Sequence, residues 1–597
     1  MRVSLTPGFA LILTACASGP APEAPGRPDA GAPPENTIDG AFATEASTAR
    51  LLTQATFGPR PADVEALLGT RASAWFRTQL ETPPSLLLPQ LDAAEERYDE
   101  RVEANPDSVL EVFLYEATTL AFWHNALRGE DQLRQRMAWA LSQLFVVSNG
   151  GGEVLSDVPA AVASFQDGLI RGAFGNFRDL LTHVTYAPAM GYYLTFLGSQ
   201  KADPATGRQP DENYARELLQ LFTIGVLELG ADGEPVVREG RAETYTNADI
   251  TGLARVFTGF HLDVTDVEVD PRAVRADPQD FGELWRLPLR IYPNRHSAEA
   301  KSFLGTTIPA GTPGDESVRL ALDAIFAHPN VAPFIGRQLI QRLVTTAPSP
   351  AYVARVAAAF DAGAVRLPDG SSVGSGRRGD LAATLAAVLF DDAARSAEGL
   401  ADLAFGKVRE PMLRYAAFVR AFVPERNLAP QYEYALYDTA GPSALAQHPY
   451  RARSVFNFYR PGYLAPGTES GAAGLTAPEL QLVNATTIPG YANFVFQAAS
   501  KEQGDFDDED RELLTAEERE AALRAMVPDY AAEIALADDP AALLAHLDLR
   551  LTYGAMPEER RAALAALVAR LDAGDDLARV HLAVWLVLTS PEFLVQR

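Results

Sequence analysis

Residues 131–147 read Asp131-Gln-Leu-Arg-Gln-Arg-Met-Ala-Trp-Ala-Leu-Ser-Gln-Leu-Phe-Val-Val147. Apolar residues recur there at positions 133, 137, 141, 144 and 145, which is the spacing of an amphipathic α-helix. Asp131 precedes the apolar series, where an acidic residue favours a helix N-terminus. The stretch therefore predicts a helix over residues 131–147, and the same pattern continues through most of the chain.

Helical spacing dominates the chain from about residue 46 onward. It predicts further helices over residues 46–58, 61–80 (with a break), 108–127, 158–171, 177–183, 211–224, 247–258, 316–327, 330–345, 351–362, 380–389, 404–422, 476–485, 514–526, 529–537, 539–549, 557–571 and 575–589. Strand signals are short: residues 235–238, residues 287–292 and a hairpin around Pro368-Asp-Gly. Strands and helices do not alternate as in βαβ units, so we predict a mainly α protein, a large multi-helix assembly with short irregular or β-hairpin inserts.

The composition is that of a folded, acidic protein. The chain has 597 residues, 78 acidic against 51 basic, and a formal net charge of −27. A nucleic-acid-binding protein needs a basic surface, so we expect no nucleic-acid partner. A mean hydropathy of −0.06 excludes a protein with many membrane spans. One cysteine in the whole chain excludes an intrachain disulfide framework and a cysteine-rich metal site.

The N-terminus carries the pattern of a bacterial lipoprotein signal. Arg2 is a minimal basic region, residues 9–13 form a short apolar region, and Leu13-Thr14-Ala15-Cys16 fits the lipobox. We therefore expect residues 1–15 to be removed and Cys16 to be lipidated, which would anchor the protein to a membrane through an N-terminal lipid. The alternatives are an ordinary signal peptide, or a cysteine that stands near the start of the chain by chance.

The residues after Cys16 read as a spacer. Residues 16–45 contain the cysteine and a Pro-, Ala- and Gly-rich stretch that has no apolar period, which is typical of an extended tether. Ala17 is not the aspartate associated with inner-membrane retention, so we expect an exported protein at the outer membrane, facing the periplasm or the surface. Residues 46–597 form the predicted helical body, in which residues 505–597 could be a helical C-terminal subdomain.

The common signatures of catalysis and metal binding are missing from the sequence. It contains no Gly-rich phosphate loop, no HExxH motif and no G-x-S-x-G motif. No two of the eight histidines are spaced i, i+3 or i, i+4, so a metal site would have to form from distant segments. We predict no metal and no cofactor.

Residues 211–225 give the densest polar helix. Asn213 and Glu217 share one face of that helix, whereas Leu218 and Leu219 lie on the other. Arg216 follows Glu212 by four residues, a spacing that allows an ion pair. Two interpretations are open: a structural hydrogen-bond network, or a cleft lined by the Glu217 carboxylate with Asn213 and Arg216 beside it.

Two further segments combine polar side chains with loop character. Residues 294–301 hold the catalytic candidate His296 and the binding candidate Lys301. Residues 450–463 alternate aromatic residues with arginines and include the binding candidates Arg453 and Asn457, a combination suited to carbohydrate or polymer contact. The alternative for both is a turn packed on the helical core.

These segments together resemble the bacterial family catalogued as domain of unknown function 1800. The resemblance rests on residues 132–148, 212–225, 245–259, 295–305, 328–335, 454–461 and 588–593, in that order along the chain. Some members of that family read Trp-His-Asn-His-Phe where this chain has Leu141-Ser142-Gln143-Leu144-Phe145, so a site built on those histidines would be lost here. The resemblance implies an exported protein, often accompanied by a second exported family, domain of unknown function 1501, which is a candidate partner.

Two main hypotheses follow for the function. The first is a lipid-anchored envelope protein that binds or organises an exported partner or a surface polymer. The second is an envelope hydrolase in which Glu217 is the general acid/base, and in which Arg216, His296 and Lys301 place an anionic or sugar substrate. A calcium-stabilised adhesin is a third interpretation, suggested only by the net acidity.

Overall fold

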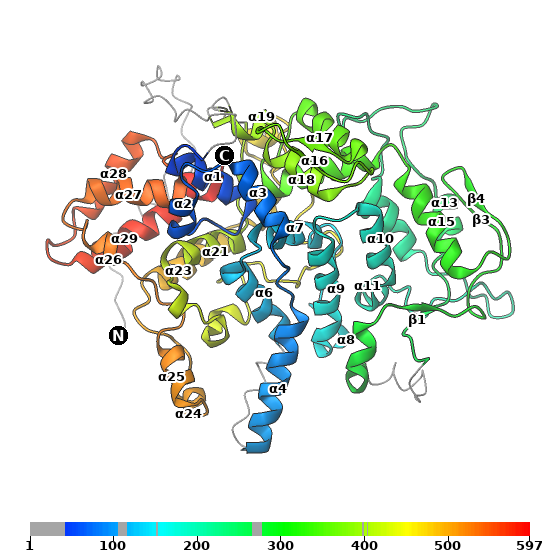
Figure 1. Cartoon of the computed structure of the whole chain (residues 1–597), viewed down its shortest axis with the longest axis horizontal. Coiled ribbons are helices and arrows are strands. Elements are labelled where there is room, and N and C mark those ends of the chain that lie inside the picture. Colours follow the sequence, from blue (N-terminus) through cyan, green and yellow to red (C-terminus); the bar gives the residue numbers. More distant parts are fainter. Residues whose placement is uncertain are drawn as a thin grey trace.

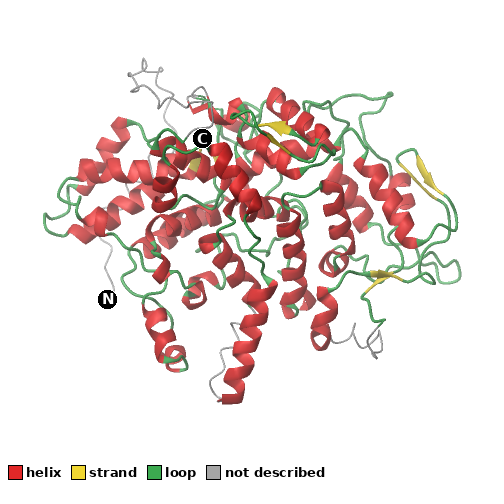
Figure 2. Ribbon diagram, in the orientation of Figure 1, coloured by secondary structure: helices red, strands yellow, loops and turns green. Residues whose placement is uncertain are grey.

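Helices account for nearly all regular structure in this protein (Figure 2). The computed structural model describes residues 42–104, 116–150, 153–265, 278–396, 399–400, 402 and 404–597. The predicted mainly α class is confirmed. Within the described residues no helix combines the length and the apolar character needed to cross a bilayer. Cys16 and residues 17–41 of the predicted tether lie outside the described residues.

The N-terminal part of the body supplies the helix that projects furthest from the molecule. Figure 1 shows that this helix, α4, points away from the body beside α6. The helices are α1 (Glu45–Ala55), α2 (Pro61–Leu67), α3 (Ala72–Glu81), α4 (Leu88–Ala104), α6 (Ala117–Arg128) and α7 (Gln132–Ser142).

The middle of the chain forms the central and right-hand parts of the molecule in Figure 1. Its helical elements are α8 (Glu153–Asp157), α9 (Pro159–Gly172), α10 (Phe177–Tyr186), α11 (Pro188–Tyr193), α12 (Asn213–Glu217), the π-helical turn η3 (Leu218–Thr223), α13 (Asn247–Ala254), the 3-10 segment η4 (Pro278–Arg286), α15 (Gly314–Phe326), α16 (Val331–Leu343), α17 (Pro350–Ala362), α18 (Leu381–Leu389) and α19 (Asp392–Arg395).

The C-terminal part returns to the N-terminal helices. It comprises α21 (Pro411–Phe422), the 3-10 turns η5 (Glu425–Asn427), η6 (Pro430–Tyr432) and η7 (Tyr434–Leu436), α22 (Glu469–Ala472), η8 (Pro478–Leu482), α23 (Thr487–Ala499), α24 (Asp508–Glu512), α25 (Ala516–Leu523), α26 (Ala531–Ile534), α27 (Pro540–Thr552), α28 (Glu558–Val568), α29 (Asp576–Leu588) and α30 (Pro591–Leu594). Helices α24 and α25 project on the same side of the body as α4 (Figure 1).

The strands are short and form two-stranded antiparallel pairs. β1 (Phe260–His261) pairs with β2 (Arg290–Ile291), β3 (Lys301–Phe303) with β4 (Thr306–Ile308), β5 (Val365–Arg366) with β6 (Ser372–Val373), and β7 (Lys407–Val408) with β8 (Val595–Gln596). The β5–β6 pair is the hairpin predicted around Pro368. The β7–β8 pair joins segments almost 190 residues apart, which fixes the end of the described chain to its centre.

One hydrophobic cluster extends through the whole body, from Phe42 to Phe593. It includes residues of α27 and α29 from the predicted C-terminal subdomain, whereas Phe506, Leu514, Ala522 and Ala525 of that region belong to a second, smaller cluster. Arg50 on α1 donates a hydrogen bond from Nε to the main-chain oxygen of Arg597 at 2.8 Å. The first helix and the last residues are therefore packed together, whereas independent folding of residues 505–597 stays a prediction.

Some predicted helix boundaries were wrong where distant segments of the chain contact the backbone. The helix predicted over 131–147 ends at Ser142. The main-chain carbonyl of the next residue, Gln143, accepts hydrogen bonds from the side chains of Arg342 and Asn457. Residues 404–410 are not helical, because β7 pairs there with β8 and Pro411 disfavours helical backbone at the preceding residue.

Other differences concern the type and extent of helix. The helix predicted over 211–224 changes from α to π geometry at Leu218. Residues 478–482 form a 3-10 turn rather than part of a longer helix, and only 531–534 of the predicted 529–537 are helical. For the helix predicted over 108–127, residues 108–115 lie outside the described part of the chain.

Candidate functional site

The polar helix that the sequence singled out is α12, and its central carboxyl is buried. Glu217 is 7% exposed, and its Oε2 atom has no hydrogen-bond partner. Burial raises the pKa of Glu217, and Arg216 partly opposes this shift. Arg216 forms the predicted ion pair with Glu212, at 3.6 Å, and Asn213 is exposed. The structure therefore places Glu217 as an internal carboxyl at the end of α12, while Asn213 and Arg216 face solvent.

His296 lies in the segment between β2 and β3, and Lys301 is the first residue of β3. The Nδ1 atom of His296 lies 2.8 Å from the carbonyl oxygen of Thr258, to which it donates, and its buried Nε2 has no partner. Lys301 is fully buried and donates from Nζ to the carbonyls of Ser297 and Glu299. Burial lowers the pKa of His296, and Lys301 contributes to that shift.

These candidates do not form one catalytic group with Glu217. Within the described part of the chain, no hydrogen bond or ion pair connects Glu217 with His296 or Lys301. Arg453, the binding candidate in the aromatic segment, is exposed, whereas Asn457 is buried and lies at a different place, beside α7. Nδ2 of Asn457 donates to the carbonyl of Gln143 at 3.4 Å, from a backbone with φ of +63°.

A buried cluster of charged side chains lies next to Asn457, at the centre of the fold. Lys407 on β7 forms an ion pair with Glu479 on η8, and its Nζ atom lies 3.8 Å from Oε1 of Glu410. Arg136 on α7 and Arg342 on α16 lie nearby, close enough for Glu410 and Glu479 to influence both. All five side chains are buried, so the cluster carries three cationic groups against two carboxyl groups.

Glu410 is the best-partnered acid of this cluster. Its Oε2 atom accepts hydrogen bonds from Trp139 Nε1 at 3.2 Å, Gln143 Nε2 at 2.5 Å and Gln447 Nε2 at 2.7 Å. Burial alone would raise its pKa, but Lys407 and Arg136 hold the pKa of Glu410 below its usual value. The adjoining cavity, beside Trp139 and Asn457, measures about 10 Å³, the space of one water molecule. We interpret the cluster as a structural centre, because it offers no room for a substrate.

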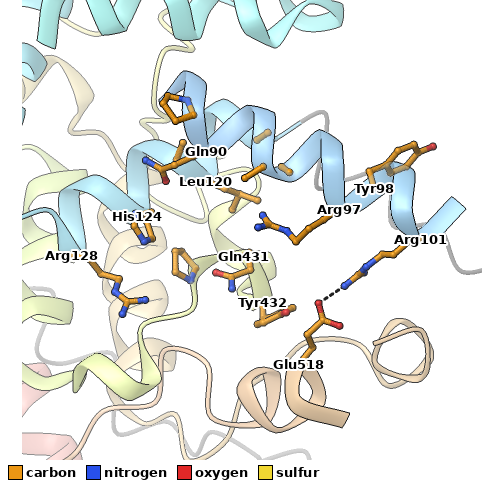
Figure 3. Close-up of a pocket in the computed structure, with 16 residues that line it drawn as sticks. Gln90, Arg97, Tyr98, Arg101, Leu120, His124, Arg128, Gln431, Tyr432 and Glu518 are labelled. Atoms are coloured by element: carbon orange, nitrogen blue, oxygen red, sulfur yellow. Dashed lines mark hydrogen bonds and ion pairs between the residues drawn. The ribbon is translucent and has the colours of Figure 1, made fainter. Parts of the chain in front are cut away.

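The space for a larger ligand lies elsewhere, between α4 and α6. A cleft of about 490 Å³ is walled by these two helices, by η6 and by α25 (Figure 3). Its floor is formed by small side chains, Ala93 and Ala94 of α4 and Ala117 and Ala121 of α6. Small residues at these positions leave space between the helices that larger side chains would fill. The volume is typical of a ligand-binding pocket.

Three arginines line this cleft. Arg97 and Arg101 come from α4 and Arg128 from α6, whereas Glu518 of α25 is the one carboxylate among the lining residues. Arg101 pairs with Glu518 at the outer end of the cleft (Figure 3). Arg97 is exposed and has no ion pair with any residue that the structure describes. The cleft is thus locally cationic in a chain of net charge −27.

The third arginine is held only by an exposed partner, and two tyrosines line the cleft with it. Arg128 pairs at 3.2 Å with Glu425, whose side chain is 75% exposed, so water weakens that pair. Tyr98 and Tyr432 also line the cleft. Burial raises the pKa of Tyr432 to about 12, so its phenol stays protonated at neutral pH. Guanidinium groups beside aromatic rings are suited to an anionic ligand that has flat faces.

The N-terminal end of α4 is fixed by the body of the protein. Asp167 of α9 accepts hydrogen bonds from the main-chain N–H groups of Leu87 at 2.6 Å and Leu88 at 3.2 Å. Gln90 Nε2 donates to Oδ1 of Asn125 on α6 at 2.7 Å. These contacts hold α4 at a fixed distance from α6, and they make the cleft part of the folded body.

This cleft was not predicted, although helix α4 has one recognisable feature in the sequence. Residues 88–104 are rich in Glu, Arg and Ala, which are strong helix formers, and they place Arg97 and Arg101 one turn apart. Helix α4 was missed because its apolar spacing is weak. The remaining walls come from residues 430–432 and 518, which only the folded chain brings to α4.

In the described part of the chain, the fold and this cleft define a helical protein with a locally cationic cleft. Its chain belongs to the family described as "Protein of unknown function (DUF1800)", which matches residues 50–595. No curated protein and no solved structure matches this chain. Among the described residues, no group of three or more His, Cys, Asp or Glu side chains is arranged to hold a metal ion.

Proposed function

We propose that the cleft between α4 and α6 binds a segment of an acidic polysaccharide, and that the protein is a lipid-anchored component of the cell envelope. The observation that carries the first part is the concentration of Arg97, Arg101 and Arg128 around one cleft of an otherwise acidic chain. Charges further away than about 8 Å are screened at physiological salt, so the local arginines decide what binds there.

The shape of the cleft favours a polymer over a small anion. At 1.5 Å per residue, the lining residues from Pro89 to Arg101 extend along α4 for about 18 Å. Cationic side chains stand at both ends of this length, Arg128 at one and Arg101 at the other (Figure 3). Tyr98 and Tyr432 offer ring faces for sugar rings. A ligand with several charged sugar units would contact all of these groups at once.

The test is a comparison of affinities. We expect the protein to bind polygalacturonate and not uncharged dextran, with an affinity that falls as salt is raised. Arg97→Gln and Arg128→Gln should each weaken binding by about 5- to 30-fold, since a charge-assisted contact contributes roughly 1 to 2 kcal/mol. Arg570→Gln is the matched control, because Arg570 is an exposed arginine outside the cleft lining. Poly-L-glutamate binding as tight as polygalacturonate binding would contradict a preference for sugars.

The anchoring part of the proposal rests on the sequence. Lipidation of Cys16 would hold the protein at the outer membrane, facing the periplasm or the surface, and an exported protein of the family domain of unknown function 1501 is the proposed protein partner. Cys16→Ser should move the protein from the detergent phase to the aqueous phase in a detergent-partition assay. Unchanged partitioning would contradict lipidation. If the protein is purified from envelope fractions and the partner does not purify with it, that result would contradict the association.

An envelope hydrolase is the second candidate function. The observation in its favour is Glu217, an internal carboxyl with a raised pKa and an unpartnered oxygen, as a general acid requires. His296 and Lys301 would then have to reach the same substrate from a different segment. If the protein degrades an acidic polysaccharide, Glu217→Gln should abolish release of reducing ends. An equal rate in the wild type and the variant would exclude Glu217 as the catalytic acid.

A further inference from the structure

His124 occupies the inner end of the cleft, one helical turn before Arg128 on α6. Figure 3 shows the two side chains together at that end, opposite the Arg101–Glu518 pair. The imidazole is half-buried, and its buried Nδ1 atom has no hydrogen-bond partner. Gln431 of η6 lies beside it (Figure 3). Because Nδ1 is buried, a ligand in the cleft would reach the imidazole at its Nε2 edge.

The groups that face His124 are mostly cationic. Arg128 lies beside it on the same helix and Arg97 of α4 lines the same cleft, whereas Arg101 and its partner Glu518 of α25 lie at the opposite end (Figure 3). Burial lowers the pKa of His124, and Arg128 lowers it further, whereas Asn125 acts in the opposite direction. The imidazole is therefore neutral at neutral pH while the cleft holds no anion.

We infer that this inner end is the subsite for an acid group of the ligand, and that His124 takes up a proton when the anion binds beside Arg128. The inference rests on the proposed polysaccharide-binding function and adds its regulation by pH. A negative charge next to the imidazole favours the imidazolium form, which then donates to the anion. The same acid group accepts from the guanidinium of Arg128.

The sign of the pH dependence follows from proton linkage. The bound anion raises the pKa of His124 above its value in the free cleft. Ligand binding is therefore coupled to proton uptake between these two pKa values, and the affinity rises as the pH falls through that range. One proton changes the affinity by at most tenfold per pH unit. Well above the bound-state pKa, binding no longer depends on this group.

Dextran sulfate is a suitable probe because its sulfate charges do not titrate between pH 5 and 8. Calorimetric titration in two buffers of different protonation enthalpy measures proton uptake on the unmodified protein. We expect uptake of up to one proton near pH 6.5, and an affinity about 3- to 10-fold higher at pH 5.5 than at pH 7.5. His124→Gln should remove the uptake and leave an affinity that is independent of pH. His581→Gln, a half-buried histidine outside the cleft lining, should retain both.

The outcomes separate this inference from the proposed function. Binding without proton uptake, or an unchanged pH dependence in His124→Gln, would overturn the role of His124 and leave polysaccharide binding intact. Absence of binding at every pH, together with full folding of the wild type, would overturn the proposed function itself. Proton uptake is measured on the wild type, so the inference stays testable even where a substitution affects folding.

Discussion

Replacing Glu410 by glutamine tests whether the buried ion cluster holds the fold together. The change preserves the size of the side chain but removes the charge that Lys407 and Arg136 face. It also turns a carboxylate that accepts from Trp139, Gln143 and Gln447 into an amide, whose NH₂ group opposes those donors. Removing one partner from a buried charge pair costs about 3–5 kcal/mol, because the remaining charge is uncompensated.

Two comparisons make this prediction specific. Glu479→Gln should cost less, because burial raises the pKa of Glu479, so that the fold stabilises its ionised form less than that of Glu410. Glu520→Gln should change stability by at most about 0.5 kcal/mol, because Glu520 is an exposed helix residue that pairs with Arg524. Both controls also remove one carboxylate.

Urea denaturation followed by tryptophan fluorescence is the appropriate assay, since the indole of Trp139 donates to Glu410. The folded-state pKa of Glu410 lies below its unfolded value, so its contribution is present above the unfolded pKa. That contribution is lost as the pH falls through the folded-state pKa. The difference between wild type and Glu410→Gln should therefore shrink in acid. A loss below 1 kcal/mol at pH 7, or equal losses for Glu410 and Glu520, would refute a structural role for the cluster.

Two further predictions concern the cleft and the core. Glu518→Gln should raise the affinity for acidic polysaccharide by about 1.5- to 5-fold in a binding titration, because it removes the carboxylate that competes for Arg101. Glutamine preserves the capping box with Thr515, so the helix should stay intact. A loss of affinity would contradict this prediction. Gly58→Ala should lower the free energy of unfolding by about 2–4 kcal/mol, because a Cβ there would lie 2.6 Å from the Cα atom of Ala417 at a φ of +130°. Gly69→Ala is its control, at a φ of +76° in open space, and equal losses in urea denaturation would show that the close approach is unimportant.

The helical class and most helix positions could be predicted because apolar spacing is a local property. Helix α17, predicted over 351–362, was found at Pro350–Ala362, and the hairpin around Pro368 was found as β5–β6. The boundaries failed where a distant segment uses the backbone. The clearest case is Gln143, whose carbonyl accepts from Arg342, 199 residues away.

The cleft could not be predicted for the same reason. Its arginines lie on α4 and α6, but the wall opposite them comes from η6 and α25, more than 300 residues further along the chain. Glu217 and His296 stood out because each lies in a polar segment, and both proved to be internal groups with one unpartnered atom. The polar segments of the sequence thus led to polar side chains that the fold buries. A cleft between helices could not be found in this way, because no residue pattern marks open space.

Hydrogen exchange measured with and without polygalacturonate shows which helices the polysaccharide contacts. Bound polysaccharide should slow exchange in α4 (Leu88–Ala104) and α6 (Ala117–Arg128), which form the cleft. Protection should be lost when Arg97 and Arg128 are both replaced by glutamine. Protection confined to α12 around Glu217, or to residues 450–463, with α4 and α6 unchanged, would contradict the account and place the binding site elsewhere.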